Sequence, residues 1–123
     1  MKYYSEDHEW VEVNGDSAII GISEYAVSEM GEATYVELPM EDDDFTVGDV
    51  IGVVETERSN FDVYSPISGT VVNINEALVD DPSLLVRSPE DKGWLCTLNN
   101  IDVSELDDMM NEIAYAKYLD TIS

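Results

Sequence analysis

The apolar and polar positions of this chain alternate in the rhythm of short strands separated by turns. Apolar residues fall in short runs, and glycine, proline, asparagine or aspartate separates most of them. This rhythm is typical of a small β-barrel or sandwich rather than of βαβ units. The predicted strands are residues 10–13, 18–22, 33–38, 50–54, 61–64, 70–74 and 94–98.

The residues between these strands predict how they are connected. Asn14-Gly15-Asp16 predicts a hairpin, because an Asn-Gly pair readily adopts the positive φ angles of a tight turn. Residues 24–30 predict a short helix, with Ser23 as its N-cap and Gly31 as its end. We also expect a turn at residues 65–69 and a short helical turn at residues 75–80.

The C-terminal segment changes to a helical period. Ser104-Glu105-Leu106-Asp107 has the form of a capping box with aspartate in its fourth position. The residues that follow have the three-four spacing of an amphipathic helix. Its predicted stripe is Leu106, Met109, Met110, Ile113, Ala114 and Lys117. We expect this stripe to pack on the barrel.

The length and composition predict one self-sufficient globular domain. The chain has 123 residues, of which 44% are hydrophobic, so a single domain over residues 1–123 is expected. The only cysteine, Cys96, lies in an apolar run, which favours a buried structural thiol. The chain contains neither a membrane-length apolar run nor the apolar core of a signal peptide. We expect a cytoplasmic protein, or a mitochondrial matrix protein if a transit peptide was removed.

The charge of the chain excludes several classes of partner. Twenty-eight acidic residues and only five basic ones give a formal charge of −23. This charge repels phosphate backbones and anionic lipids, so neither nucleic acid nor membrane is an expected partner. The acidic surface either steers the protein toward basic docking patches or keeps it soluble in a salty cytoplasm, and both can hold. We expect a monomer.

The residues that could carry metal chemistry or catalysis do not form a convincing site. Glu41-Asp42-Asp43-Asp44 lacks the alternating ligands and central glycine of a calcium loop, and Pro39 and Gly48 around it favour a turn. His8 has no second histidine or cysteine near it in the sequence. No nucleophile–base pair or phosphate loop is recognisable. We therefore expect no metal site, no catalytic residue and no enzymatic activity.

Residues 53–69 are the most distinctive stretch, because they predict a β-hairpin that presents Arg58 at a tight turn. Around this hairpin, motifs in the same order and spacing resemble the H-protein of the glycine cleavage system. The resemblance covers nearly the whole chain. The matching segments are residues 8–11, 20–26, 30–32, 35–39, 54–55, 62–69, 73–78, 92–95 and the helix containing Tyr115.

The resemblance implies a mainly β fold of the lipoyl/biotinyl type. This fold is a barrel-sandwich hybrid with short helices and a C-terminal helix. Members of the family are not enzymes by themselves. Their lipoyl group, attached to a lysine at the hairpin tip, takes an aminomethyl unit from glycine decarboxylase and presents it to the aminomethyltransferase. Dihydrolipoamide dehydrogenase then reoxidises it.

This sequence departs from the family at that lysine. The family reads roughly Glu-Ser-x-Lys-Ala-x-Ser-Asp where this chain has residues 55–62, so Arg58 stands in the lysine position. Amide formation needs a deprotonated amine, whereas a guanidinium stays protonated in proteins. Lys2, Lys92 and Lys117 lie outside the motif. Because of this departure we expect a chain without a lipoyl group, although lipoate is the cofactor of the family.

The expected contact residues lie on the same hairpin. In the family, the positions of Glu55 and Gly69 belong to the hairpin that lipoate-attaching enzymes recognise, although Gly69 also suits a turn. We expect partners to bind at Glu55, Glu57, Arg58, Asn60 and Phe61. The candidate partners are the three enzymes above and lipoate ligase. Trp10 and Tyr64 are expected to be packing residues.

Three functions remain open from the sequence. The first is an H-protein-like regulator or scaffold that carries no lipoyl group. The second is a working lipoyl carrier in which the lysine was deliberately replaced by Arg58. The third is a carrier that uses Ser59 instead, although no nearby residue in the sequence could act as its base.

Overall fold

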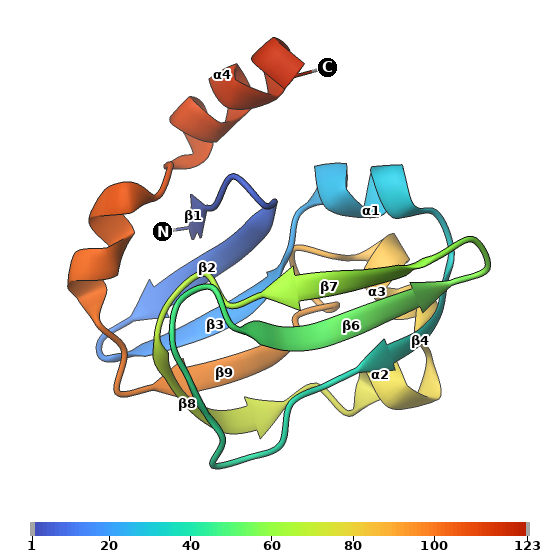
Figure 1. Ribbon diagram of the computed structural model, residues 1–123, viewed down its shortest axis with the longest axis horizontal. Helices are drawn as coiled ribbons and strands as arrows, with labels where there is room; N and C mark the ends of the chain where they lie inside the picture. The colour runs from blue at the N-terminus through green and yellow to red at the C-terminus, as the bar shows by residue number, and fades with distance from the viewer. Residues whose placement is uncertain (1, 123) are drawn as a thin grey trace.

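Two antiparallel β-sheets face each other in the computed structural model, which describes residues 2–122 (Figure 1). In spatial order, the larger sheet consists of β1 (Lys2–Tyr4), β2 (Glu9–Asn14), β3 (Ser17–Ile22), β9 (Cys96–Asn99), β8 (Gly69–Ile74) and β5 (Asp44–Phe45). The smaller sheet consists of β4 (Ala33–Glu37), β6 (Val50–Thr56) and β7 (Asn60–Tyr64). The predicted mainly β architecture is confirmed. The very short strands β1 and β5 were not predicted from the sequence.

The core lies between the two sheets. Ile20 and Leu98 of the larger sheet and Val54 of the smaller sheet have no exposed surface. Because side chains alternate between the faces of a strand, each sheet contributes one apolar face to this core. Cys96 is also fully buried, and burial raises the pKa of its thiol to about 12. The expectation of a buried structural thiol is therefore confirmed.

The β2–β3 hairpin shows how one large side chain is accommodated. Asn14 pairs with Ser17, and Gly15 in the turn has a φ of 66°. Trp10 pairs with Gly21, and a Cβ on Gly21 would lie 2.6 Å from the Trp10 ring. The missing side chain of Gly21 therefore makes room for a tryptophan that is only 2% exposed. Trp10 is a packing residue, as expected.

Three short helices lie at the ends of the sheets. In α1 (Glu24–Met30), the Ser23 hydroxyl accepts a hydrogen bond from Ala26 N and Gly31 ends the helix with a φ of 83°, as predicted. α2 (Ala77–Asp80) matches the expected helical turn, whereas α3 (Ser83–Arg87) was not predicted. α3 buries Leu85 completely, so packing rather than a capping residue accounts for this helix.

The predicted C-terminal helix is confirmed, but its predicted N-terminal part is not continuous with it. Residues Val103–Asp108 form a 3₁₀ helix, η1, whose N-cap is Asp102. The predicted capping box does not form, because Asp102 is the N-cap and its carboxylate accepts hydrogen bonds from Ser104 N at 3.1 Å and Ser104 Oγ at 2.6 Å. The Glu105 carboxylate instead accepts hydrogen bonds from Ser68 N and Ser68 Oγ, both at 2.7 Å. Met110 then pairs with Tyr4 through two backbone hydrogen bonds, which interrupts the helix.

The helix α4 begins only after this interruption, at Glu112, and extends to Ile122. The Asn111 side chain accepts a hydrogen bond from Ala114 N at 2.8 Å, which is the geometry of an N-cap. Ile113, a member of the predicted stripe, is 70% exposed. The face that packs consists of Tyr115, Tyr118 and Leu119, which join Tyr4 and Trp10 in a second, smaller cluster.

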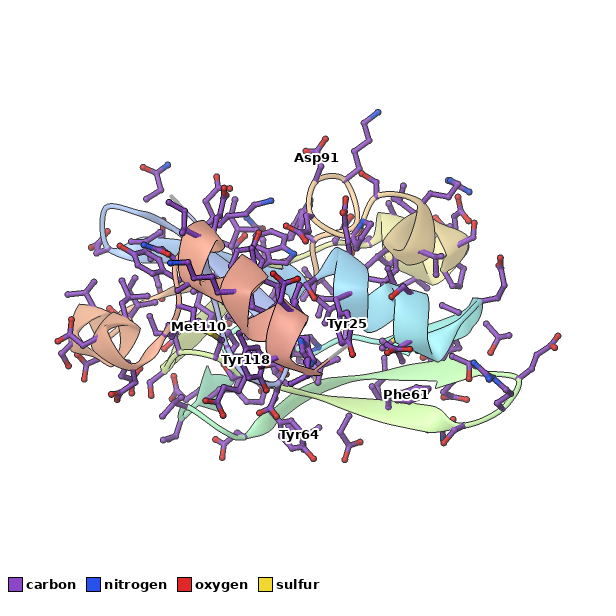
Figure 2. All side chains as sticks on the ribbon, turned by 90° about the horizontal axis from the view of Figure 1, so that it is seen from above. Tyr25, Phe61, Tyr64, Asp91, Met110 and Tyr118 are labelled. Atoms are coloured by element: carbon purple, nitrogen blue, oxygen red, sulfur yellow. The ribbon has the colours of Figure 1, made fainter. Side chains whose placement is uncertain are left out.

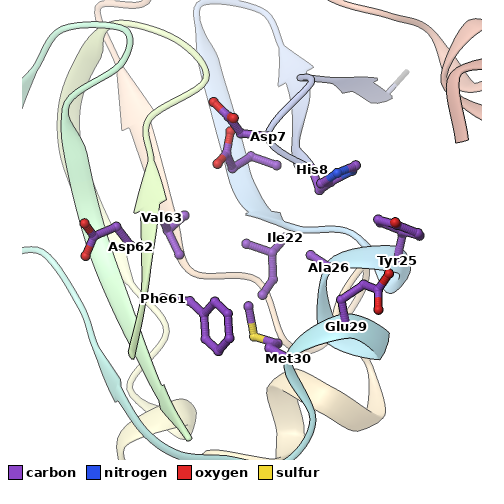
Figure 3. Close-up of a pocket in the computed structure, with 11 residues that line it drawn as sticks. Asp7, His8, Ile22, Tyr25, Ala26, Glu29, Met30, Phe61, Asp62 and Val63 are labelled. Carbon is purple, nitrogen blue, oxygen red and sulfur yellow. The ribbon is translucent and has the colours of Figure 1, made fainter. Parts of the chain in front are cut away.

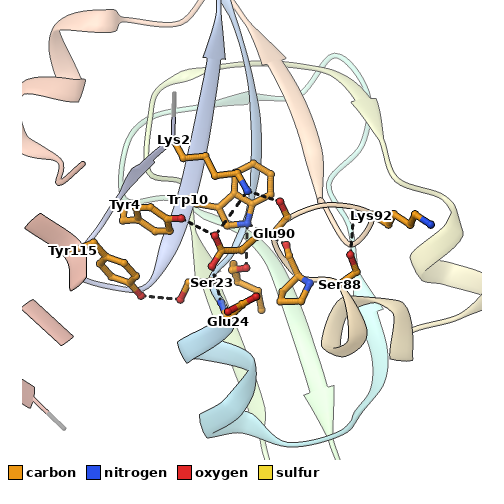
Figure 4. A network of polar contacts seen from close by, with 11 residues as sticks. Lys2, Tyr4, Trp10, Ser23, Glu24, Ser88, Glu90, Lys92 and Tyr115 are labelled. Atoms are coloured by element: carbon orange, nitrogen blue, oxygen red, sulfur yellow. Dashed lines mark hydrogen bonds and ion pairs between the residues drawn. The ribbon is translucent and has the colours of Figure 1, made fainter. Parts of the chain in front are cut away.

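Glu90 links several segments that are distant in the sequence (Figure 4). Its carboxylate accepts hydrogen bonds from Tyr4 Oη at 2.6 Å and from Glu24 N at 3.0 Å. Lys2 forms an ion pair with the same carboxylate and lies over the Trp10 ring, 4.5 Å from its centroid. One acidic side chain thereby ties the first strand to the start of α1.

Candidate functional site

The β6–β7 hairpin places Arg58 at its end, as the sequence predicted. Glu55 pairs with Asn60, and residues 56–59 form the turn, which we call the tip. The Thr56 hydroxyl organises the tip by donating to Ser59 O at 2.8 Å and accepting from Ser59 N at 3.1 Å and Arg58 N at 3.3 Å. This side-chain turn holds the backbone at Arg58 in a defined position.

The expected contact residues differ in their exposure. Glu57, Arg58 and Asn60 are exposed, whereas Glu55 and Phe61 are half-buried. Phe61 packs against the edge of the core, so its ring also has a structural role. Gly69 does not lie near the tip: it is buried in β8, where a Cβ would lie 2.7 Å from Asn99 O. Its small size serves the close approach of β8 and β9.

Arg58 turns back toward α1 from the tip. Its Nη2 atom lies 3.4 Å from the position that a Cβ on Gly31 would occupy. Gly31 ends α1, and the carbonyl end of a helix attracts cations. No ion pair within residues 2–122 joins Arg58 to Glu55. The tip guanidinium therefore lies beside the end of α1.

A groove of about 350 Å³ separates β7 from α1 and from the loop before β2 (Figure 3). We call it the β7 groove. Figure 3 shows Phe61 and Met30 side by side at one end of it, with Tyr25 and Glu29 on its α1 side. The groove is lined by Asp7, His8, Glu9, Ile22, Tyr25, Ala26, Glu29, Met30, Phe61, Asp62 and Val63.

Glu9 is the most perturbed carboxyl group of this groove. It is only 3% exposed and accepts hydrogen bonds from Ser5 Oγ at 2.6 Å and Tyr64 N at 3.3 Å. Burial raises its pKa from 4.5 to about 7, although these hydrogen bonds oppose the shift. Glu9 therefore changes charge near neutral pH while joined to an edge of the hairpin.

A chain of hydrogen bonds joins the groove to α4. Ser23 Oγ lies 2.7 Å from Tyr115 Oη, which lies 2.8 Å from His8 Nδ1. Because Ser23 Oγ accepts from Ala26 N, its own proton is free to be donated to Tyr115. Tyr115 can then donate to an unprotonated His8 Nδ1. Burial lowers the pKa of His8, which favours this neutral form.

Sequence reasoning missed most of this groove. Asp7, Glu9, Tyr25 and Glu29 come from segments that are distant from β7 in sequence. Only the fold brings them beside Phe61. Tyr64, which was expected to pack, is 38% exposed. Its position at the rim of the smaller sheet is visible in Figure 2.

Other candidate chemistry finds no support in the geometry. Ser59 Oγ contacts the carbonyl of Asn60 at 3.4 Å, and a carbonyl cannot act as a base. Within residues 2–122, no three histidine, cysteine, aspartate or glutamate side chains are placed to hold a metal ion. The run 41–44 forms a turn and the start of β5. None of the helices within residues 2–122 has the length and apolar character needed to cross a membrane.

Known proteins resemble this chain over almost its full length. The chain is 46% identical over 118 residues to the glycine cleavage system H protein of Thermoanaerobacter sp., covering 96% of this chain and 93% of that protein. It is 43% identical over 119 residues to glycine cleavage system H protein 1 of Caldanaerobacter subterraneus, covering 97% and 94%.

The fold and the family profile agree with these relatives. The crystal structure of a glycine cleavage system H protein from Mycobacterium marinum superposes with a TM-score of 0.85 at 28% identity, covering 96% of this chain and 95% of that one. The profile of the glycine cleavage H-protein family matches residues 2–122. Members of this family are non-enzymatic lipoyl carriers that interact with glycine cleavage proteins. The chain therefore belongs to the glycine cleavage H-protein family.

Proposed function

We propose that this chain is an H-protein-like protein that carries no lipoyl group and acts by binding other proteins, as a regulator or scaffold. The observation that carries the proposal is Arg58 at the tip of the β6–β7 hairpin. This is the place where the resemblance to the family puts the acylated lysine. The partners we propose are glycine cleavage components or lipoate ligase, in the cytoplasm or the mitochondrial matrix.

The chemistry of Arg58 does not fit a covalently attached lipoyl group. Lipoylation forms an amide and needs a free amine lone pair, whereas a guanidinium is delocalised and protonated. The described lysines offer no substitute on the hairpin. Lys2 pairs with Glu90, Lys92 follows α3, and Lys117 is on α4. We therefore derive no acyl-transfer step for this chain.

Protein binding is supported by the exposure of the tip and by the charge of the molecule. Glu57, Arg58 and Asn60 are open to a partner, and Phe61 adds a half-buried aromatic ring beside them. Aromatic and arginine side chains are enriched among residues that dominate binding energy. The formal charge of −23 favours a basic partner surface.

The first experiment is intact-mass measurement after co-expression with lipoate ligase and added lipoate. We expect the unmodified mass, because Arg58 cannot be acylated. A lipoyl adduct would overturn the proposal. The Arg58→Lys variant should gain one adduct if the hairpin still fits the ligase. The Arg87→Lys variant is the matched control, since it places a lysine on α3 and should stay unmodified.

A second experiment locates the binding surface. Purified glycine cleavage components and lipoate ligase are titrated with the protein at low and at high salt. We expect binding that weakens at high salt and is lost in Arg58→Glu or Phe61→Ser variants. The Arg87→Glu variant makes the same charge change on α3 and should bind normally. Equal binding by all the variants would place the interface elsewhere.

A further inference from the structure

β7 is an edge strand with an open side. The smaller sheet has the order β4-β6-β7, so β6 pairs with only one side of β7. Tyr64 N turns away from β6 and donates to Glu9 Oε2 at 3.3 Å. Because successive residues direct their backbone groups to opposite sides of a strand, Asp62 and Asn60 turn theirs to the same open side. Unpaired strand edges of this kind pair readily with another chain.

The β7 groove runs beside this open edge and offers an apolar floor. Phe61 and Val63 come from β7, and Ile22 and Met30 lie across from them (Figure 3). An added strand would place every second side chain on this floor. Its remaining side chains would share the outer face with Asp62, which is exposed.

The charge around the open edge of β7 determines which kind of segment can bind there. The carboxylates of Asp7 and Glu29 face the groove, and Asp62 adds an acidic side chain on the outer face of β7, in a molecule with a formal charge of −23. Opposite charges on neighbouring strands stabilise the pair, whereas like charges oppose it. A second copy of this chain would bring an equal negative charge to the edge and is therefore disfavoured. A basic segment of a different protein is favoured.

We propose that the open edge of β7 binds an extended partner segment in which apolar and basic residues alternate, adding a strand beside β7. This inference rests on the proposed function, because it specifies the partner of a protein that acts by binding. Backbone hydrogen bonds to Asn60 and Asp62 would supply the pairing, and the groove floor and Asp62 would select the side chains.

The test uses three synthetic peptides with the 123-residue chain at low salt. The first is acetyl-Lys-Val-Lys-Val-Lys-amide, the second has glutamate in place of lysine, and the third is the lysine peptide N-methylated at every backbone nitrogen. Binding is followed by the amide NMR signals of the protein. We expect only the first peptide to shift the amides of Asn60 and Asp62, because the third keeps its charge but has no backbone donor.

Two variants test the side-chain selection. Asp62→Lys should weaken binding of the first peptide roughly threefold to tenfold, as expected for reversal of one close cross-strand charge pair. Asp91→Lys makes the same change on the face of the molecule away from the hairpin, as Figure 2 shows, and should bind like the unchanged protein. Both residues are exposed, so both variants should fold.

Three results would overturn the inference. They are equal binding of the N-methylated peptide, shifts confined to residues outside β7 and its groove, and pairing of two copies of the protein through β7. These results are independent of the mass measurement. A lipoyl adduct refutes the proposed function, whereas an unmodified mass without peptide binding refutes only the β7 inference.

Discussion

Glu9 and His8 are adjacent in the sequence, and burial gives them opposite effects on stability as the pH changes. The pKa of Glu9 is raised from 4.5 to about 7, so its contribution to stability is complete below pH 4.5 and is lost as pH rises toward 7. The pKa of His8 is lowered from 6.5, so its contribution is complete above pH 6.5 and is lost as pH falls. The two effects partly cancel near neutrality.

We predict that the Glu9→Gln variant shows the pH dependence of stability that His8 alone produces, without the opposing contribution of Glu9. The amide can accept from Tyr64 N and donate to Ser5 Oγ, so the fold should be kept. As pH rises from 4.5 to 7, the raised pKa of Glu9 should cost the unchanged protein at most about 3 kcal/mol in free energy of unfolding. The variant should not show this loss. Urea unfolding across this pH range measures it.

The matched control is Glu6→Gln, which neutralises an exposed carboxylate in the loop just before β2. Its stability should follow the pH dependence of the unchanged protein. If the Glu9→Gln curve also stayed parallel to that of the unchanged protein, the pKa of Glu9 would not be raised by folding.

For single residues, the sequence predicted correctly those roles that depend only on neighbouring residues in the chain. Ser23, Gly31 and Arg58 were placed correctly because a cap, a helix end and a hairpin tip depend on a few adjacent residues. Glu9 was not recognised, because its pKa is raised by burial that only the folded chain creates, and one of its hydrogen bonds comes from Tyr64 N, which lies far along the chain. Gly69 was assigned to a turn, although its close contact is with Asn99 on a neighbouring strand.

Among the elements, α4 is held by a small set of contacts. Tyr115 stacks on Tyr4 with ring centroids 4.2 Å apart, and its hydroxyl joins Ser23 and His8. The rest of the packing face is only half-buried. Elements with few buried contacts open before the core does.

We predict that Tyr115→Phe loosens α4 and leaves the barrel intact. The change keeps the stacked ring and removes the two hydroxyl contacts, at an expected cost of about 1–2 kcal/mol in local opening. Hydrogen exchange of the α4 amides should accelerate, while exchange in β3 and β9 should not. Tyr118→Phe is the control, since Tyr118 packs in the same cluster and its hydroxyl is outside this network.

Equal exchange in both variants would show that the hydroxyl contacts do not hold α4.

The C-terminal segment also shows why the boundaries of helices are hard to predict from sequence. The Ser104 capping box was a valid local pattern, but Asp102 caps the 3₁₀ helix and Met110 pairs with Tyr4. The long-range pairing of Met110 with Tyr4 interrupts the helix and sets where α4 begins.

For the whole molecule, the sequence predicted the positions of the strands better than the way they assemble into two sheets. Alternating apolar positions located most strands because one face of each sheet is buried. The pairing order, the edge position of β7 and the groove beside it follow from how the sheets close on each other, and local patterns do not contain this information. The family resemblance supplied the architecture that the patterns left open.

The formal charge of −23 should make stability depend on salt. Screening by salt reduces self-repulsion among exposed carboxylates, so the melting temperature should rise as sodium chloride is added. Sucrose at matched osmolality is the control, since it stabilises without screening. The double variant Glu41→Gln, Asp42→Asn should be more stable at low salt and should gain less from added salt.

Asparagine is chosen at position 42 because Asp42 has a φ of 72°, which asparagine tolerates well. A melting temperature that stayed constant with salt in both proteins would show that repulsion does not limit stability.

The burial of Cys96 gives the protein a practical property. Its only thiol is inside the core, with a pKa of about 12, so common alkylating reagents should not reach it in the folded state. A cysteine introduced by Arg58→Cys would then be the single accessible thiol. Fluorophores, spin labels or synthetic tethers could be attached there selectively, at the position where relatives are expected to carry their own flexible arm.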